Sequence, residues 1–268
     1  MLQAVTSLSQ GVHRPDDRAV TSDLTVDESL LLHALGWEPV DLVFGVSVTA
    51  VQAGAWTWGR GQLQSPSDAH NLAVSTASSR LRQECAAVGG HGVVGVRAGV
   101  EIHPRHVDVA LVGTAVRPIG SDRPPVQPFV SGLSARDFAL LAAAGWSPIG
   151  LAFGASFVYA PRRDAATALR QSRQNVELTN PTQALYAARE AAMERMQASG
   201  LALGAQGVVG VQIAEGPMTF ARHVIGFTAR GTAVRLLAGE HRTITPDIVL
   251  PLNDAVVQFE AEALRGRR

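Results

Sequence analysis

Leu24-Thr-Val-Asp-Glu-Ser-Leu-Leu-Leu-His-Ala-Leu-Gly-Trp37 returns without gaps, 109 residues later, as Leu133-Ser-Ala-Arg-Asp-Phe-Ala-Leu-Leu-Ala-Ala-Ala-Gly-Trp146. Two further blocks recur in the same order. Gly92-Val-Val-Gly-Val96 returns as Gly207-Val-Val-Gly-Val211 at an offset of 115, and Gly113-Thr-Ala-Val-Arg117 returns as Gly231-Thr-Ala-Val-Arg235 at an offset of 118. Small loop insertions in the second copy would produce this growing offset. The pattern therefore predicts an internal tandem duplication.

Each copy shows the same order of elements. A short helix comes first, with a capping box at Thr25-x-x-Glu28 or Ser134-x-x-Asp137 and a C-terminal glycine at Gly36 or Gly145. We expect strands at about 39–51 and 148–160, long helices at about 67–88 and 181–203, and hairpins of 92–102 with 106–117 and 207–215 with 222–236. The predicted fold is α+β: two tandem copies of a β-α-β-β two-layer sandwich, each preceded by a short helix.

The long helix of each copy is predicted to present a narrow apolar stripe to its sheet. In the first copy the stripe comprises Val74, Ala77, Leu81, Cys85 and Val88. The counterparts 115 residues later are Arg189, Ala192, Met196, Gly200 and Leu203. Such small side chains favour a close approach of helix and sheet, and we expect the strand glycines at 92, 95, 207 and 210 to permit it.

The domain organisation follows from the repeat and from a proline-rich joint. We predict an N-terminal tail at 1–22, a first repeat at 23–120, a linker at 121–131, a second repeat at 132–239 and a C-terminal tail at 240–268. The C-terminal tail has no counterpart in the first half, and it ends in Arg-Gly-Arg-Arg.

The blocks at 204–211 and 231–235, placed in strand-helix-strand-strand order, resemble the YbjQ-like family, whose members are described as putative heavy-metal-binding. The resemblance covers roughly 39–117 and 148–236. It implies small domains that assemble into ring-like pentamers. This chain departs from the single-domain pattern in being doubled and in having leading helices and tails.

A metal site is one hypothesis that the residues allow, because soft metals such as zinc or copper favour thiolate and imidazole ligands. Cys85, His91, His103 and His106 are the candidates, with Asp108 nearby. His103 and His106 would flank a hairpin turn and could converge on one ion. The alternative is that no metal or other cofactor binds: Cys85 lies on the apolar stripe, and the sequence has no Cys-x-x-Cys or His-Glu-x-x-His motif.

An enzymatic role is not expected. No Gly-x-Ser-x-Gly elbow is present, and the Gly-Val-Val-Gly blocks lack the spacing of a dinucleotide-binding loop. Ser47 and Ser156 recur at matched positions, but in apolar strands, where a buried and hydrogen-bonded hydroxyl is the simpler interpretation.

Composition limits the other partners. The 23 basic residues balance 23 acidic ones, so a nucleic-acid surface is not expected. One cysteine, no basic-apolar leader and no long apolar run predict a cytoplasmic protein without a membrane span. Two features suggest protein partners: Trp56 and Trp58 in a glycine-rich loop, and a C-terminal segment that includes Phe259.

The resulting prediction is a non-enzymatic, ring-forming homo-oligomeric scaffold or assembly component, a pentamer or a decamer. One chain would supply a subunit to each of two stacked rings, which we favour, or two neighbouring subunits of a single ring. The alternatives are a heavy-metal or small-ligand binding protein with sites at the His-bearing hairpins or at subunit interfaces, and an accessory part of a larger bacterial assembly.

Overall fold

The computed structural model describes residues 20–52, 61–121, 125, 127–159, 179–217 and 224–237. Within these ranges the chain forms two four-stranded sheets and four helices. The helices are α2 (Val26–Ala34), α3 (Gln64–Ala87), α4 (Ala135–Ala143) and α6 (Thr179–Ala202). The strands are β1 (Trp37–Ala50), β2 (Gly61–Gln62), β3 (Gly92–Ile102), β4 (His106–Pro118), β5 (Phe129–Val130), β6 (Trp146–Tyr159), β7 (Gly207–Pro217) and β8 (Val224–Leu236). The fold is therefore mixed α+β.

The three long strands of each sheet are paired in the same way. Sheet A has the order β1-β4-β3-β5, and sheet B has the order β2-β6-β8-β7. Trp37 faces Pro118 in sheet A as Trp146 faces Leu236 in sheet B, and both sheets carry a register shift at the first proline of the leading strand. A second shift, in the third long strand of each sheet, lies between Val94 and Arg97 in β3 and between Val209 and Gln212 in β7. The main strands of both sheets thus match at the sequence offsets of 109, 115 and 118.

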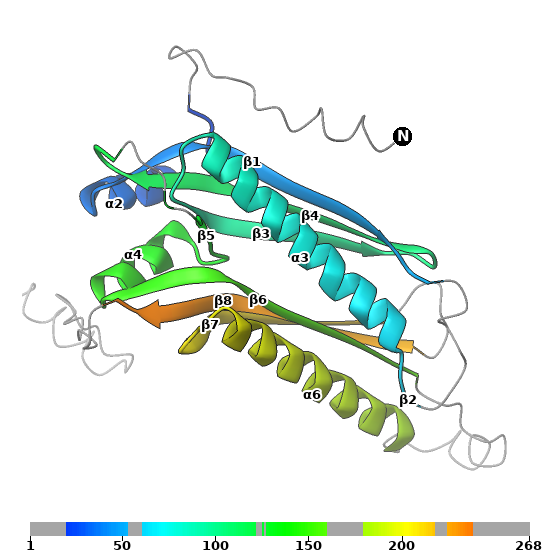
Figure 1. Cartoon of the computed structure of the whole chain (residues 1–268). Coiled ribbons are helices and arrows are strands. Elements are labelled where there is room, and N and C mark those ends of the chain that lie inside the picture. Colours follow the sequence, from blue (N-terminus) through cyan, green and yellow to red (C-terminus); the bar gives the residue numbers. More distant parts are fainter. Residues whose placement is uncertain are drawn as a thin grey trace, which may run out of the picture.

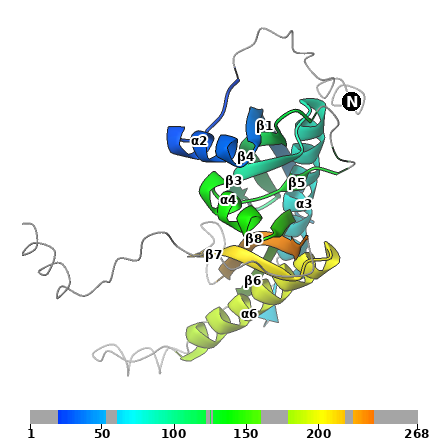
Figure 2. The same cartoon turned by 90° about the vertical axis from the view of Figure 1, so that its left-hand side faces the viewer.

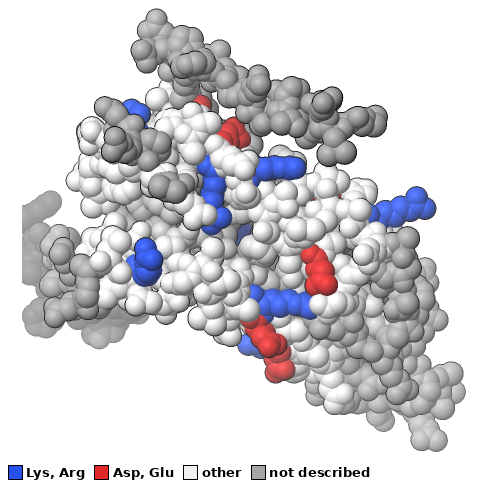
Figure 3. All heavy atoms as spheres, viewed as in Figure 1, with Lys and Arg blue, Asp and Glu red and all other residues white. Residues whose placement is uncertain are grey.

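Each sheet has its long helix on one face, so each half is a two-layer unit. Figure 1 shows α3 lying along sheet A and α6 along sheet B, with α2 and α4 together at one end of the molecule. Figure 2, turned by 90°, shows the first half above the second half. On the face drawn in Figure 3 charged side chains are sparse, in keeping with a charged fraction of 17%.

The short helices begin and end as the sequence predicts. Thr25 caps α2, and it forms a reciprocal capping box with Glu28. Ser134 caps α4 through the Asp137 amide, while the Asp137 carboxylate accepts a hydrogen bond from the Ser134 hydroxyl. Gly36 and Gly145 follow the two helices with φ of 77° and 82°, values that glycine adopts without the strain of a side chain.

The apolar stripe of α3 is confirmed, but its expected counterpart on α6 is partly wrong. Ala77, Leu81 and Cys85 are fully buried. On α6 Ala192 and Met196 are buried as expected, whereas Arg189 is exposed and the preceding Ala188 is buried in its place. The stripe therefore passes through an alanine, which lets α6 lie against its sheet without burying a guanidinium group.

The glycines that permit close helix packing are not the expected ones at 92, 95, 207 and 210. They are Gly45 in β1 and Gly154 in β6. A Cβ atom on Gly45 would lie 2.1 Å from the Ala77 carbonyl oxygen, and one on Gly154 would lie 2.3 Å from the Ala192 carbonyl oxygen. The helix backbone occupies the space of the missing side chain. At Gly95, by contrast, a Cβ atom would meet nothing within 4 Å, so this glycine serves the bulge of β3, where its φ is +67°.

The two halves exchange short strands. β5, just before α4, pairs in parallel with β3 of sheet A, and β2, just before α3, pairs with β6 of sheet B. The first turns of α3 also reach sheet B, because the Phe157 amide donates to the Ser67 hydroxyl and the Ala155 amide donates to the Asn71 side chain. The segment predicted as a linker, 121–131, thus ends in a strand of sheet A.

His70 lies at this contact between α3 and sheet B. Its ring is 4% exposed and packs edge-on against Phe157, with the ring centroids 6.3 Å apart. Burial lowers the pKa of His70 from 6.5 to about 4, an effect that the Asn71 side chain opposes in part. The imidazole is therefore neutral at pH 7.

We expect Gly45→Ala to destabilise the fold by about 2–4 kcal/mol, because the added methyl group must push α3 away from β1. Gly99→Ala is the matched control, since its Cβ atom would meet only the Ala110 carbonyl oxygen, at 3.9 Å. Urea unfolding of the two variants measures the difference. Equal midpoints for both variants would show that α3 does not need the glycine at position 45.

Acid should weaken the fold through His70. The folded-state pKa lies below the unfolded value of 6.5, so the unfolded chain binds the proton first and stability falls as the pH drops from about 6.5 toward 4. The loss amounts to roughly 3 kcal/mol at most. His70→Leu, which copies Leu185 at the equivalent position of α6, should remove this component. Urea unfolding at pH 7.5 and pH 5, with exposed His33→Ala as control, tests it.

Candidate functional site

The tip of the β3–β4 hairpin brings His103 and His106 together. The His103 amide donates to the His106 carbonyl oxygen at 2.9 Å, which closes the turn. This places the two imidazole rings in a stack with centroids 4.5 Å apart. The convergence expected from the His-Pro-Arg-His spacing is therefore present in the structure.

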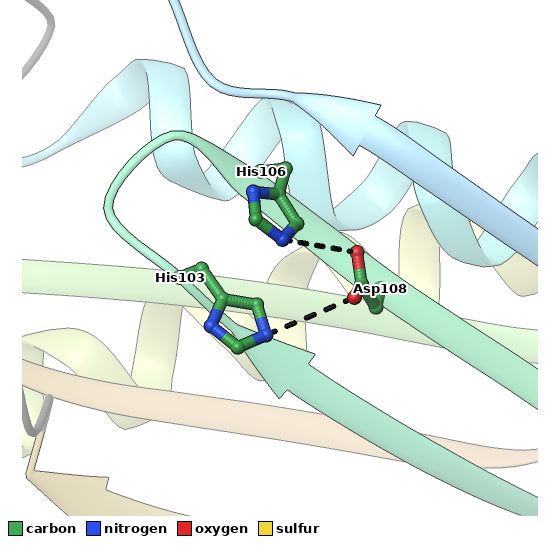
Figure 4. Close-up of side chains that lie close together, drawn as sticks. All are labelled: His103, His106 and Asp108. Atoms are coloured by element: carbon green, nitrogen blue, oxygen red, sulfur yellow. Dashed lines mark ion pairs between the residues drawn. The ribbon is translucent and has the colours of Figure 1, made fainter.

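Asp108 completes the cluster, because residues 106 and 108 of one strand point to the same face. The Asp108 carboxylate lies 3.7 Å from His103 Nε2 and 3.6 Å from His106 Nε2, one oxygen toward each ring (Figure 4). The ligand atoms of all three side chains lie within 4.8 Å of one another. The three side chains are 38–43% exposed, so the cluster is open to solvent.

The donor set fits a divalent transition metal. Two imidazole nitrogens and a carboxylate oxygen suit zinc or copper, and tetrahedral zinc holds such ligands about 3.3 Å apart. Oδ1 of Asp108 is buried and has no hydrogen-bond donor, which leaves a carboxylate oxygen available to a cation. Glu101, 3.5 Å from His103 Nε2, offers a further oxygen from the same hairpin. The sequence signal for Glu101 is its position two residues before His103.

Cys85 and His91 are not brought to this cluster. His91 precedes β3 and its Nε2 lies 3.3 Å from the Ser121 hydroxyl, at the end of the 11-residue strand remote from His103. An 11-residue strand spans roughly 36 Å. Cys85 is fully buried on α3, and burial raises the pKa of its thiol to about 12. The thiolate that a metal requires is thus disfavoured there.

Among the described residues of sheet B, the cluster has no counterpart. The positions equivalent to His106 and Asp108 are Val224 and Gly226. Trp56, Trp58 and Phe259, predicted as partner-binding residues, lie outside the residues that the structure describes.

The junction of the two halves forms a second polar feature. Arg97 forms an ion pair with Asp23 at 2.9 Å. Arg230 of sheet B donates hydrogen bonds to the Gln212 side chain at 2.7 Å and to the Ala98 carbonyl oxygen of sheet A at 3.3 Å. These groups line a shallow pocket between the sheets. Of these contacts, the hydrogen bond from Arg230 to the Ala98 carbonyl oxygen joins the two halves.

No helix in the described part of the chain is both long enough and apolar enough to cross a membrane.

Comparison with known proteins gives two matches. Residues 162–237 match the YbjQ_1 family, which is described as putative heavy-metal-binding, so the second half contains a YbjQ-like domain. The chain is 38% identical over 247 residues to the encapsulin nanocompartment protein Rv1762c of Mycobacterium tuberculosis (strain ATCC 25618 / H37Rv), an alignment that covers 88% of this chain and 93% of the relative. No solved structure matches significantly.

Sequence identity at this level over nearly the whole length of both proteins indicates shared ancestry and a shared fold. The chain belongs to the family of the encapsulin nanocompartment protein Rv1762c.

Proposed function

We propose that the chain is a non-enzymatic, self-associating structural component of a protein nanocompartment. The name of its relative in Mycobacterium tuberculosis supports a place in such an assembly. The observation that carries the proposal is a row of exposed apolar side chains on each outer long strand. Phe44, Val46 and Val48 on β1 are 47%, 51% and 66% exposed.

β7 shows the same property at the far end of the other sheet. Val209, Val211 and Ile213 are 36%, 40% and 47% exposed. β1 and β7 are the edge strands of their sheets and have 14 and 11 residues. Long apolar edges invite pairing with another chain, and folded proteins normally cover them. Self-association would bury both.

A structural role also agrees with the burial of the two serines that recur at matched positions. Ser47 and Ser156 are 3% and 0% exposed in the strands that the long helices cover. The Ser47 hydroxyl lies 3.3 Å from the Thr49 hydroxyl. Hydroxyls buried in this way stabilise the sheet and have no access to a substrate.

We further propose that the two halves arose by tandem duplication and that several chains close a ring of five or ten units. The matched registers of sheets A and B support the duplication. β5, at the start of the second half, extends the edge of sheet A, and this direct contact between the halves favours two neighbouring subunits of one ring over one subunit in each of two stacked rings.

The test is native mass spectrometry of the purified full chain. We expect a discrete multiple of the 28.2 kDa chain that persists after chelator treatment. Sedimentation velocity at several concentrations provides an independent measurement. A stable monomer in both experiments would refute the proposal.

Metal binding at the hairpin tip is a second candidate function, supported by the Asp108 carboxylate, whose two oxygens each face one imidazole and whose Oδ1 accepts no hydrogen bond. Such a site would be additional to assembly, because its ligands lie at the hairpin tip of sheet A alone.

Zinc titration of chelator-treated protein, followed by calorimetry, tests the second candidate. We expect one ion per chain, and an affinity at least about 100-fold lower for His103→Ala/His106→Ala and for Asp108→Asn. His91→Ala, at the other end of β3, is the matched control and should bind normally. Unchanged binding by the double variant would exclude the hairpin tip.

A further inference from the structure

Apolar positions that are buried in the second half are exposed in the first half. Val26 and Leu30 of α2 are 76% and 65% exposed. The residues 109 positions later, Ala135 and Ala139 of α4, are 0% and 4% exposed. The difference arises because α4 packs against α2 and sheet A, where Ala135 joins a cluster with Leu32.

β1 repeats this contrast against β6. Val46 and Val48 are 51% and 66% exposed, whereas their equivalents Ala155 and Phe157 are 0% and 1% exposed. The amides of Ala155 and Phe157 bond to side chains of α3, the long helix of the other half. We call Val20, Val26, Leu30, Val46 and Val48 the head face.

The opposite contrast is found on β7. Val209 and Val211 are 36% and 40% exposed, whereas their equivalents in β3, Val94 and Val96, are 0% and 8% exposed. Val94 is covered by Phe129, Ala135 and Phe138, the chain segment that opens the second half. We call Tyr186, Val209, Val211 and Ile213 the tail face.

Backbone groups of the tail face point to the same missing partner. In β3 the Gly95 amide donates to the Leu133 carbonyl oxygen at 2.8 Å, and the Val96 amide donates to the Ser131 carbonyl oxygen at 3.0 Å. β7 has the same bulge, with Gly210 at φ +61°. Among the described residues, the Gly210 and Val211 amides have no acceptor outside the sheet.

The chain itself contains the segment that fits these amides. Ser22 and Leu24 are identical to Ser131 and Leu133 at the offset of 109. The residue between each pair is also held in the same way on its own sheet. The Asp23 amide donates to the Thr114 hydroxyl at 3.2 Å, and the Gly132 amide donates to the Thr232 hydroxyl at 3.0 Å. The segment at 20–24 is therefore positioned like 129–133, but it pairs with no strand in the part of the chain that the structure describes.

We infer that the head face of one chain docks on the tail face of a second copy, and that this contact reproduces the junction between the two halves. Residues 20–24 would pair with β7 as 129–133 pair with β3. α2 would pack on α4, and α6 would reach β1 of the neighbour as α3 reaches β6. Arg230 crosses the internal junction, and its equivalent in the first half is Val112. In the proposed contact, Val112 of one copy would face the exposed Ile213 of the other, which suits two apolar side chains.

This contact is heterologous, so it leaves one head and one tail free until the chain of copies closes into a ring. The inference refines the proposed self-association by assigning its surface. The two can be tested separately, because an assembly held by another surface would survive substitutions in these faces.

The first test mixes two blocked variants. The head variant is Val26→Glu/Leu30→Glu, the tail variant is Val211→Glu/Ile213→Glu, and the control is Leu201→Glu on α6, where Leu201 is 73% exposed. We expect wild type and control to assemble, and each blocked variant alone to be monomeric with association weakened about 100-fold or more. Mixed together, the two variants should form a dimer of one copy each, because one still has a tail and the other a head.

The second test fixes the register. Phe129 pairs with Gly92, so Val20 of one copy should pair with Gly207 of the next. A Cβ atom at Gly207 would meet only Val234, at 3.7 Å, so a cysteine fits there. Oxidation of Val20→Cys/Gly207→Cys should give a ladder of reducible multimers, whereas the buried Cys85 of wild type should give none.

Three results would overturn the inference. Blocked variants that assemble like wild type would place the interface elsewhere while leaving the proposed function intact. Blocked variants that stay monomeric when mixed, without the cysteine ladder, would exclude head-to-tail pairing. A monomeric wild type without the ladder would refute both proposals, and it is also the expected result if residues of the same chain cover the tail face.

Discussion

The close approach of one helix backbone to one strand backbone determines how each half of this protein is built. Ala77 and Leu81 of α3 lie so near β1 that the strand has room only for Gly45, and Ala192 and Met196 of α6 have the same relation to Gly154. A crossing this tight requires small side chains along the helix, which accounts for its alanine-rich stripe. It also fixes the angle of the helix on the sheet, since any side chain at the crossing would separate the two layers.

With the helix so close on one face, the other surfaces of each sheet must be covered by something else. Sheet A obtains this cover from the second half: β5 extends its edge, and α4 packs with α2 over Val94 and Val116. The segment that begins the second half thus belongs to the cores of both halves, because Leu133 also approaches Gly210 of sheet B. Neither half has a complete core without the other, and the second half lacks what the first half receives.

The sequence predicts the elements well because periodicity and capping are local properties. The stripe of α3, the caps at Thr25 and Ser134 and the histidine pair at the hairpin tip all follow from spacing. The strand exchange could not be predicted, since β2 and β5 have two residues each and show no alternation. The role of the glycines was assigned to the wrong strand, because only the three-dimensional crossing distinguishes Gly45 from Gly95. Glu101 and His70 were not predicted, although the sequence contains a signal for each. Glu101 lies two residues before His103, and His70 continues the apolar stripe of α3 one turn before Val74.

A unit that covers its edge with a second unit of matching strand register has a physical reason to continue beyond one chain. The internal junction is formed by positions equivalent to the head and tail faces, so the proposed contact between chains would use the same positions. Burying an apolar side chain of valine or leucine size contributes about 1.5–3 kcal/mol. The head face has five such residues, and the tail face has three together with Tyr186, so both carry apolar surface that would oppose the entropy lost on association. If the proposed contact between chains repeats the internal junction, the angle between sheets A and B within one chain sets the number of chains that would close the ring.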